Sequence, residues 1–401
     1  MDVFSLNKAK INRQELLLLG CICFLYFIFV LIVFVCFKRT FSHDTMWQFG
    51  GAHYFYNCLM NGVFPYWDIY NYCGGPFYYN IGILRLLEIT TFPLVFIFKF
   101  FNLSLFSLYH LDFLTKIFLY ALGVYFAMRK VSKYTLSGLF AFFVFIFSTF
   151  TFVSFRQSGV FVTFAWTAWG MWFLMRLLED KFNIYNMVGF CFFLGLSLNS
   201  YQGAYVLTFM QFFFLSLLFN RKAYLLSLIK DRKNRRIFLI GVLVISGLFL
   251  HTLAVFIEKD KNIAIMRQMY QGTSVPIMPA DYLGLFFPGV AAKFWNSLNC
   301  KQYFSECAFY IGIIPLLLSV WGMVSSRHKF RFNFIFVLMA LVLVSINLQQ
   351  YLGWVKYLLL PFLIYARNME IFQPFVIFVL VYFCSQGADD LIQRLNQNKD
   401  A

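Results

Sequence analysis

The chain is poor in charge, and in acidic residues above all. Charged residues make up 12% of its 401 residues, with 17 Asp and Glu against 33 Lys and Arg. Water-soluble domains carry about 25% charged residues, whereas 61% of this chain is hydrophobic. This composition excludes a water-soluble globular protein. The net charge of +16 does not predict nucleic-acid binding, because most basic residues fall in short connections between apolar runs, where they set membrane topology.

Metal-ligand spacing is missing as well. The nine cysteines include no Cys-x-x-Cys pair and no Cys/His cluster spaced like a zinc site, so a zinc site is disfavoured. We expect no metal and no cofactor, although Asp44 and Asp68 could hold a metal ion. Cys58 with Cys73, or Cys300 with Cys307, could form disulfides in an oxidising compartment. We also expect no cleavable signal peptide, since the first apolar run is too long and no small-residue cleavage site follows it.

Apolar runs of about 20 residues recur along the whole sequence, which predicts helices that cross a membrane. We therefore expect an all-α integral membrane protein of about ten transmembrane helices, forming one polytopic domain over residues 1–401. The expected spans are 16–37, 105–128, 134–155, 160–178, 187–203, 204–219, 237–257, 308–325, 333–348 and 371–388.

The basic residues predict which connections face the cytoplasm. If both termini lie inside, the densest basic run, Lys230 to Arg236, falls on the cytoplasmic side of an inner membrane. Three long segments then face outward: 38–104, 258–307 and 349–370. The first of them contains the apolar stretch 92–100, which includes Pro93 and is too short to span. We expect this stretch to form an interfacial helix.

Acidic residues in the first outer loop are the best candidates for chemistry. Asp44 lies seven residues after the first expected span, next to His43. A carboxylate at the membrane surface can act as a general base, although Asp is also a favoured helix N-cap. His53 follows nine residues later, and we place it near the site as a supporting or interfacial residue.

A second acid of this loop stands in a turn-rich setting. Asp68 ends the run Pro65-Tyr66-Trp67-Asp68, and Gly74-Gly75-Pro76 follows it. Proline fixes φ and the glycines permit turns, so we expect a rigid loop whose aromatic residues, Trp67 among them, can pack on the membrane surface. Asp68 is either a contact to a sugar hydroxyl or the centre of an Asx-turn.

Ionisable residues at the expected outer membrane edge offer further candidates. Arg156 and Arg367 could each grip a lipid-linked phosphate, or simply anchor the protein to lipid headgroups. Asp112 and Lys116 stand one helical turn apart near the outer end of the second span. They form either an ion pair within the helix or part of a polar cavity.

The order of these elements resembles that of membrane glycosyltransferases of the GT-C class, and more closely the bacterial YfhO-like branch. The resemblance is carried by Asp44, by Gly62-Val63-Phe64-Pro65-Tyr66-Trp67-Asp68, and by Gly74-Gly75-Pro76. Tyr310-Ile311-Gly312-Ile313-Ile314-Pro315 and the Arg367 segment before the last span also look like that branch. Some relatives carry an Asp-Glu pair, whereas Thr45 follows Asp44 here.

The resemblance implies an inverting glycosyltransferase of the cell envelope, working on the outer face of the membrane. Its donor would be a polyprenyl-phosphate sugar, its acceptor a cell-envelope glycan or lipid, and Asp44 its base, with no metal or cofactor. Two other functions stay open. A transporter or flippase of lipid-linked saccharides would need a polar path through the spans, and a polysaccharide polymerase would use outer-loop arginines such as Arg267 and Arg367.

Overall fold

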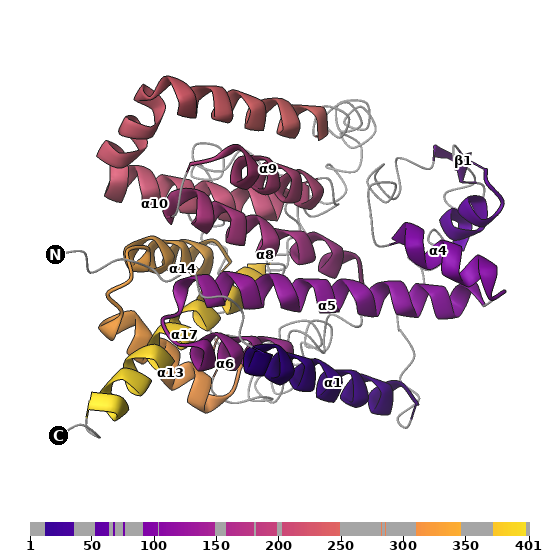
Figure 1. The fold of residues 1–401 in the computed structure, drawn as a ribbon, viewed down its shortest axis with the longest axis horizontal. Helices are drawn as coiled ribbons and strands as arrows, with labels where there is room; N and C mark the ends of the chain where they lie inside the picture. Colours follow the sequence, from indigo (N-terminus) through magenta and orange to yellow (C-terminus); the bar gives the residue numbers. More distant parts are fainter. Residues whose placement is uncertain are drawn as a thin grey trace, which may run out of the picture.

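The chain folds as a bundle of helices, which confirms the all-α class (Figure 1). This computed structural model describes residues 13–35, 53–63, 67–68, 75–76, 91–102, 104–148, 158–179, 182–198, 203–248, 282, 285, 310–345 and 372–397. The helices are α1 (Arg13–Val35), α4 (Thr91–Phe100), α5 (Leu105–Val131), α6 (Thr135–Ile146), α8 (Ser158–Glu179), α9 (Ile184–Leu198), α10 (Gly203–Lys230), α13 (Ile313–Ser325), α14 (Arg331–Ser345) and α17 (Gln373–Gln397). Two further helices cover 53–60 and 232–248, and the short strands β1 (Trp67–Asp68) and β2 (Gly75–Pro76) pair with each other.

Few of the described helices combine the length and the composition of a membrane span. Two of them, α5 and α17, are long and apolar enough to cross a bilayer, and a third span results if the bent pair Tyr205–Leu228 and Arg232–Leu248 counts as one. The expected number of about ten is therefore not confirmed. The apolar run expected to span at 134–155, for example, gives α6 of 12 residues, and a span needs about 20.

The segment 221–236, which we expected to connect the spans 204–219 and 237–257, is almost entirely helical. This corrects the boundaries expected from the sequence. Helix α10 runs on through a kink at Arg221 to Lys230, and the helix 232–248 begins two residues later. The residues after the kink include Ala223, Leu225 and Leu226, all good helix formers. The chain turns back sharply here, with an angle of 110° between the two helices.

Helix α5 lies in the middle of the bundle and contacts both of its halves (Figure 1). It packs against α6 on one side and against α8 on the other, and α8 in turn packs against α9. Helix α17 packs against α6, α13 and α14, and α14 also contacts α10. The core is largely aromatic and aliphatic, as where the Phe334 ring stacks on Tyr382 with 4.0 Å between centroids.

Glycines set the distance between α13 and α17. A Cβ added at Gly322 would lie 2.0 Å from the carbonyl oxygen of Phe383, and one at Gly387 would lie 2.1 Å from that of Leu318. Ser319, one turn before Gly322, donates a hydrogen bond to the carbonyl of Leu380 at 2.8 Å. Small residues at helix crossings allow such close backbone approach in membrane proteins.

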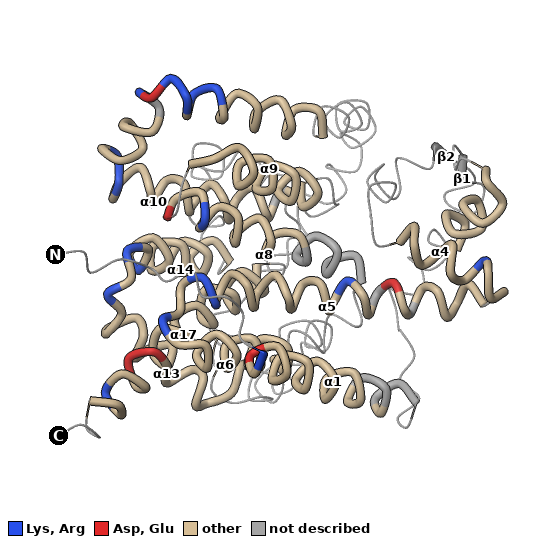
Figure 2. Tube along the Cα trace, in the orientation of Figure 1, with Lys and Arg blue, Asp and Glu red and all other residues tan. Residues whose placement is uncertain are grey.

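Basic residues gather at the end of the bundle where α5 ends and α14 begins (Figure 2). At that end, the Glu179 carboxylate is 2% exposed and lies 3.2 Å from Nε2 of His328, 3.4 Å from Nζ of Lys329 and 3.7 Å from Nζ of Lys130. Nδ1 of His328 is 2.8 Å from the hydroxyl of Tyr382. One carboxylate at the end of α8 thus joins α5, the α13–α14 connection and α17.

Two other acids stabilise the same end of the bundle. Asp389 of α17 accepts hydrogen bonds from the backbone N–H groups of Lys133 at 2.5 Å and Tyr134 at 3.0 Å, just before α6 begins. Glu15 of α1 is buried and accepts hydrogen bonds from Arg129, at 2.7 Å, and from Tyr125. Each contact joins helices that are far apart in the sequence.

The basic residues around Glu179 lower the pKa of its carboxyl group. Burial alone would raise the pKa of Glu179, but the contact with His328 and the charges of Lys329 and Lys130 lower it below its ordinary value. Burial lowers the pKa of Lys329, and the negative charge of Glu179 partly offsets that effect. The charged form of Glu179 therefore stabilises the folded protein.

Replacing Gly322 with alanine should destabilise the α13–α17 crossing by about 1–3 kcal/mol, because the new methyl group meets a backbone carbonyl that has no room to move aside. Gly20→Ala in α1 is the matched control, since a Cβ there has nothing within 4 Å. Thermal unfolding of the two variants in detergent measures the difference. Equal melting temperatures would contradict the close crossing.

Glu179→Gln should destabilise the protein by about 3 kcal/mol at neutral pH, because it leaves partly buried cations without their anion. The folded-state pKa of Glu179 is depressed, so its contribution is present above the ordinary glutamate pKa of about 4.3 and is lost as the pH falls through the lower folded value. The melting temperatures of wild type and variant should therefore converge in acid. Asp390→Asn, which removes an exposed pair with Arg394, is the control and should cost at most about 1 kcal/mol. A difference that does not change with pH would count against the ionic explanation.

Candidate functional site

The predicted site residues fall mostly at or beyond the edges of the described structure. His53 is exposed at the start of the helix 53–60, and the backbones of Trp67 and Asp68 form β1. The remaining predicted residues lie outside the described residues: His43, Asp44, Arg156 and Arg367. The structure therefore describes the framework around the first outer loop, and the roles of these residues stay predictions.

The helix 53–60 ends at the glycine that opens the first-loop motif. Gly62 has a φ of 67°, a left-handed conformation that glycine adopts without steric cost. Its N–H bonds to the carbonyl of Leu59 at 3.1 Å, and the N–H of Val63 bonds to that of Cys58 at 2.9 Å. These two bonds form a Schellman motif. The glycine of Gly-x-x-Pro-x-Trp-Asp therefore ends a helix.

The two halves of the first-loop motif pair with each other. Strands β1 and β2 are antiparallel, with Trp67 opposite Pro76 and Asp68 opposite Gly75. Proline lacks an N–H and is tolerated only at the edge or end of a strand, which matches the two-residue length of β2. The two ends of the expected turn-rich loop are thus held next to each other by backbone pairing.

The motif Tyr310 to Pro315, which also carries the resemblance, is explained by the way α13 begins. Gly312 precedes α13 with a φ of 99°, and its carbonyl accepts the N–H of Leu316 at 3.0 Å. Pro315 stands in the first turn of α13, where no N–H is needed. The glycine and the proline in Tyr310 to Pro315 therefore start a helix, and this explains their spacing without a catalytic role.

A buried carboxylate, Asp112 of α5, joins the bundle to the first-loop helices, which are the helix 53–60 and α4. Its Oδ2 accepts hydrogen bonds from the hydroxyl of Tyr56 at 2.7 Å and from Nζ of Lys116 at 2.7 Å, and its Oδ1 accepts one from the hydroxyl of Thr91 at 2.9 Å. Asp112 and Lys116 are each 3% exposed, as residues, and Thr91 and Tyr56 are fully buried. This confirms the ion pair expected one helical turn apart.

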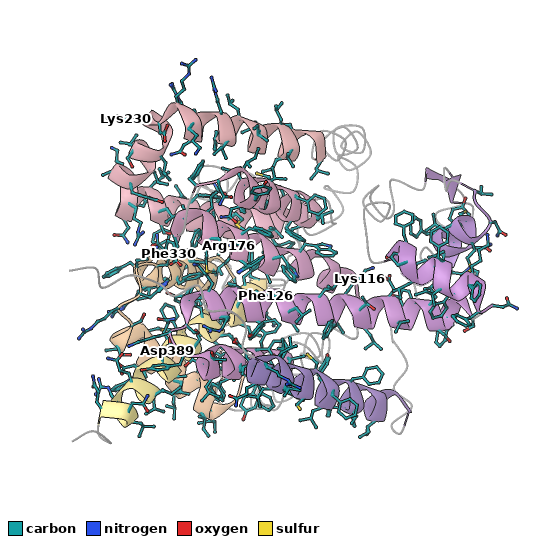
Figure 3. The ribbon with its side chains drawn as sticks, in the orientation of Figure 1. Lys116, Phe126, Arg176, Lys230, Phe330 and Asp389 are labelled. Carbon is teal, nitrogen blue, oxygen red and sulfur yellow. The ribbon has the colours of Figure 1, made fainter. Side chains whose placement is uncertain are left out.

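The cluster has partners that the sequence did not indicate. Tyr56 comes from the helix 53–60 and Thr91 from the first residue of α4, so one carboxylate connects three helices. Tyrosine and threonine are too common in this chain to signal such a contact by spacing. Lys116 lies toward the α4 end of α5, away from Arg176, Phe330 and Asp389 (Figure 3). Hence the cluster fixes the first-loop helices at the end of the bundle remote from most of the basic residues.

Helix α4 has the composition of a helix that lies at a membrane surface. Thr91, Val95 and Phe98 are buried toward the bundle, whereas Phe96 is 71% and Phe100 83% exposed. Pro93 stands in the first turn of this helix, as the sequence allows. The expectation of a short helix over 92–100 is confirmed, and its interfacial position stays a prediction.

Cys58 lies on the buried side of the helix 53–60 and carries a free thiol, so the disulfide considered with Cys73 is not formed. Within the described ranges, no three His, Cys, Asp or Glu side chains group as metal ligands. The absence of a metal from the proposed site stays a prediction. In comparisons with known proteins, no family model, no curated protein and no solved structure matches this chain.

Asp112→Asn should loosen the first-loop helices, because it weakens the hydrogen bonds from Tyr56 and Thr91 and leaves the Lys116 ammonium buried without its anion. We expect the Cys58 thiol to react several times faster with a membrane-impermeant maleimide, followed by mass spectrometry of the labelled peptide. Thr115→Ala is the control on the same helix, since Thr115 bonds only within the helix, to the carbonyl of Leu111 at 2.8 Å. Equal labelling rates in both variants would show that Asp112 does not hold these helices.

Proposed function

We propose that this protein is a membrane glycosyltransferase that transfers a sugar from a polyprenyl-phosphate donor to a cell-envelope acceptor, with its active site at the first outer loop. The proposal is supported chiefly by the pairing of β1 with β2, which brings together the two halves of the first-loop motif on which the resemblance rests. The buried Asp112 cluster supports it further, because a reacting loop needs a rigid base.

In the proposed reaction, Asp44 takes the proton of an acceptor hydroxyl. The acceptor oxygen forms a bond to the anomeric carbon as the bond from that carbon to the phosphate oxygen breaks, so the configuration inverts. The polyprenyl phosphate leaves with the bonding electron pair. Arg367, together with Arg156, stabilises the negative charge that grows on this phosphate. Trp67, Asp68, His43 and His53 would contact or orient the sugars.

The contacts of the buried acids disfavour transport of lipid-linked saccharides as the main activity. A transporter would need ionisable groups lining a path through its spans. In the described helices, Glu15, Asp112, Glu179 and Asp389 are instead engaged in contacts between helices. A polysaccharide polymerase remains the second candidate, because Arg267 and Arg367 of the outer loops would suit it.

Asp44→Asn should lower sugar transfer from polyprenyl-phosphate donors in membranes at least about 100-fold, the usual contribution of a general base. Asp68→Asn should lower it less if Asp68 only contacts the sugar, and equally if the two acids act together. Asp390→Asn, an acid at the opposite end of the bundle, is the matched control and should keep full activity.

Full activity of a folded Asp44→Asn protein would overturn the mechanism. Full activity of Arg367→Ala would remove only the phosphate contact. If donor turnover depended on Arg267 and Arg367 but not on Asp44, the result would favour the polymerase.

A further inference from the structure

An open cleft of about 720 Å³ lies where the helix 232–248 begins, beside the start of α9. Lys230 marks the bend that precedes this helix, at the end of the bundle that also carries Arg176 and Phe330 (Figure 3). The cleft is remote from the first-loop helices and is no part of the proposed active site. It is formed by the densest basic run of the chain.

One side of the cleft is cationic. Arg232, Lys233 and Arg236 line it and all three are exposed. No ion pair joins any of them to an acid in the described part of the chain. The only acid in the lining is Asp231, whose Oδ1 accepts the backbone N–H of Lys233 at 2.9 Å. The cleft therefore keeps a net positive charge, which favours an anionic ligand.

The other side of the cleft is apolar. Ile184, Ile237 and Ile240 line it, and beside them the ring of Tyr185 is 82% exposed. The helix 232–248 continues this apolar surface away from the cations, with Leu239 60% and Leu243 71% exposed. A free phosphate ion would use the cations alone, whereas a ligand with an anionic head and a long apolar tail matches both sides.

The position of the cleft adds a third argument. It lies at the bend of 110° between two apolar helices, where the chain turns back and its basic residues gather. Basic groups at such a position meet the headgroup region of a bilayer, where anionic lipids raise the local negative potential. Arginine can grip a phosphate through two parallel N–H groups.

We propose that this cleft binds one anionic phospholipid, with its phosphate held by Arg232, Lys233 and Arg236 and an acyl chain lying along the helix 232–248. The bound lipid would brace the sharp turn between α10 and this helix. The site is independent of the proposed transferase reaction.

The test is lipid binding to the full-length protein in neutral detergent, followed by native mass spectrometry during titration with phosphatidylglycerol. We expect one molecule to bind well ahead of the others, and phosphatidylcholine to bind without this preference. Arg236→Gln should weaken the first binding about tenfold, because one charge-assisted contact to the phosphate is lost. Ile240→Gln should weaken it too, if the acyl chain lies where we place it.

The chain supplies a closely matched control. Arg235 belongs to the same basic run and is equally exposed, but it does not line the cleft. Arg235→Gln removes the same charge from the same helix and should leave the first binding unchanged. Equal losses in Arg235→Gln and Arg236→Gln would overturn the proposal, since charge density alone would then explain binding. Loss of the bound lipid in millimolar inorganic phosphate, with no effect of Ile240→Gln, would show a site for soluble phosphate and also overturn it.

Discussion

This structure depends on one constraint: moving a charged side chain out of water costs free energy unless the charge gains a partner. In a chain this apolar, an acid that leaves water must find a cation or hydrogen-bond donors, or the folded state loses several kcal/mol. Glu15, Asp112, Glu179 and Asp389 all meet this requirement through partners on other helices or on the connections between helices. Because such contacts are directional, whereas apolar packing is not, these four acids select one arrangement of helices among the many that would bury the same apolar surface.

Helix α5 carries such charged contacts near both of its ends. Asp112 lies near its start, and Arg129 and Lys130, which contact Glu15 and Glu179, lie near its end. At a rise of about 1.5 Å per residue, Asp112 and Lys130 are about 27 Å apart along the axis, close to the thickness of a hydrocarbon core. The stretch of α5 between them thus has the length of a span, and its polar contacts lie toward the two ends of this stretch. A single helix, α5, therefore connects the first-loop helices with the end of the bundle where the basic residues gather.

The sequence predicted those features that depend only on residues close together in the chain. The pair Asp112–Lys116 follows from a spacing of four on one helix, and α4 from an apolar stretch with proline in its first turn. The contacts of Asp112 with Tyr56 and Thr91, and those of Glu179 with three basic residues, could not be predicted, because they depend on which helices become neighbours. The number of spans is not confirmed, for a related reason. An apolar run shows that a segment avoids water, but the helix boundaries also depend on contacts between distant segments, such as those of Asp389 of α17 with the backbone just before α6.

The same contacts narrow the choice of a catalytic acid. A general base must present an oxygen to the proton of the substrate. Both oxygens of Asp112 already accept hydrogen bonds, Oδ2 from Tyr56 and Lys116 and Oδ1 from Thr91, and the residue is buried. Asp112 contacts the helix 53–60 and α4, and it is suited to holding these helices in place rather than to taking a proton. In the proposed reaction, the work is then divided between a buried acid, Asp112, that fixes the framework and the loop acids Asp44 and Asp68, which are the candidates for chemistry.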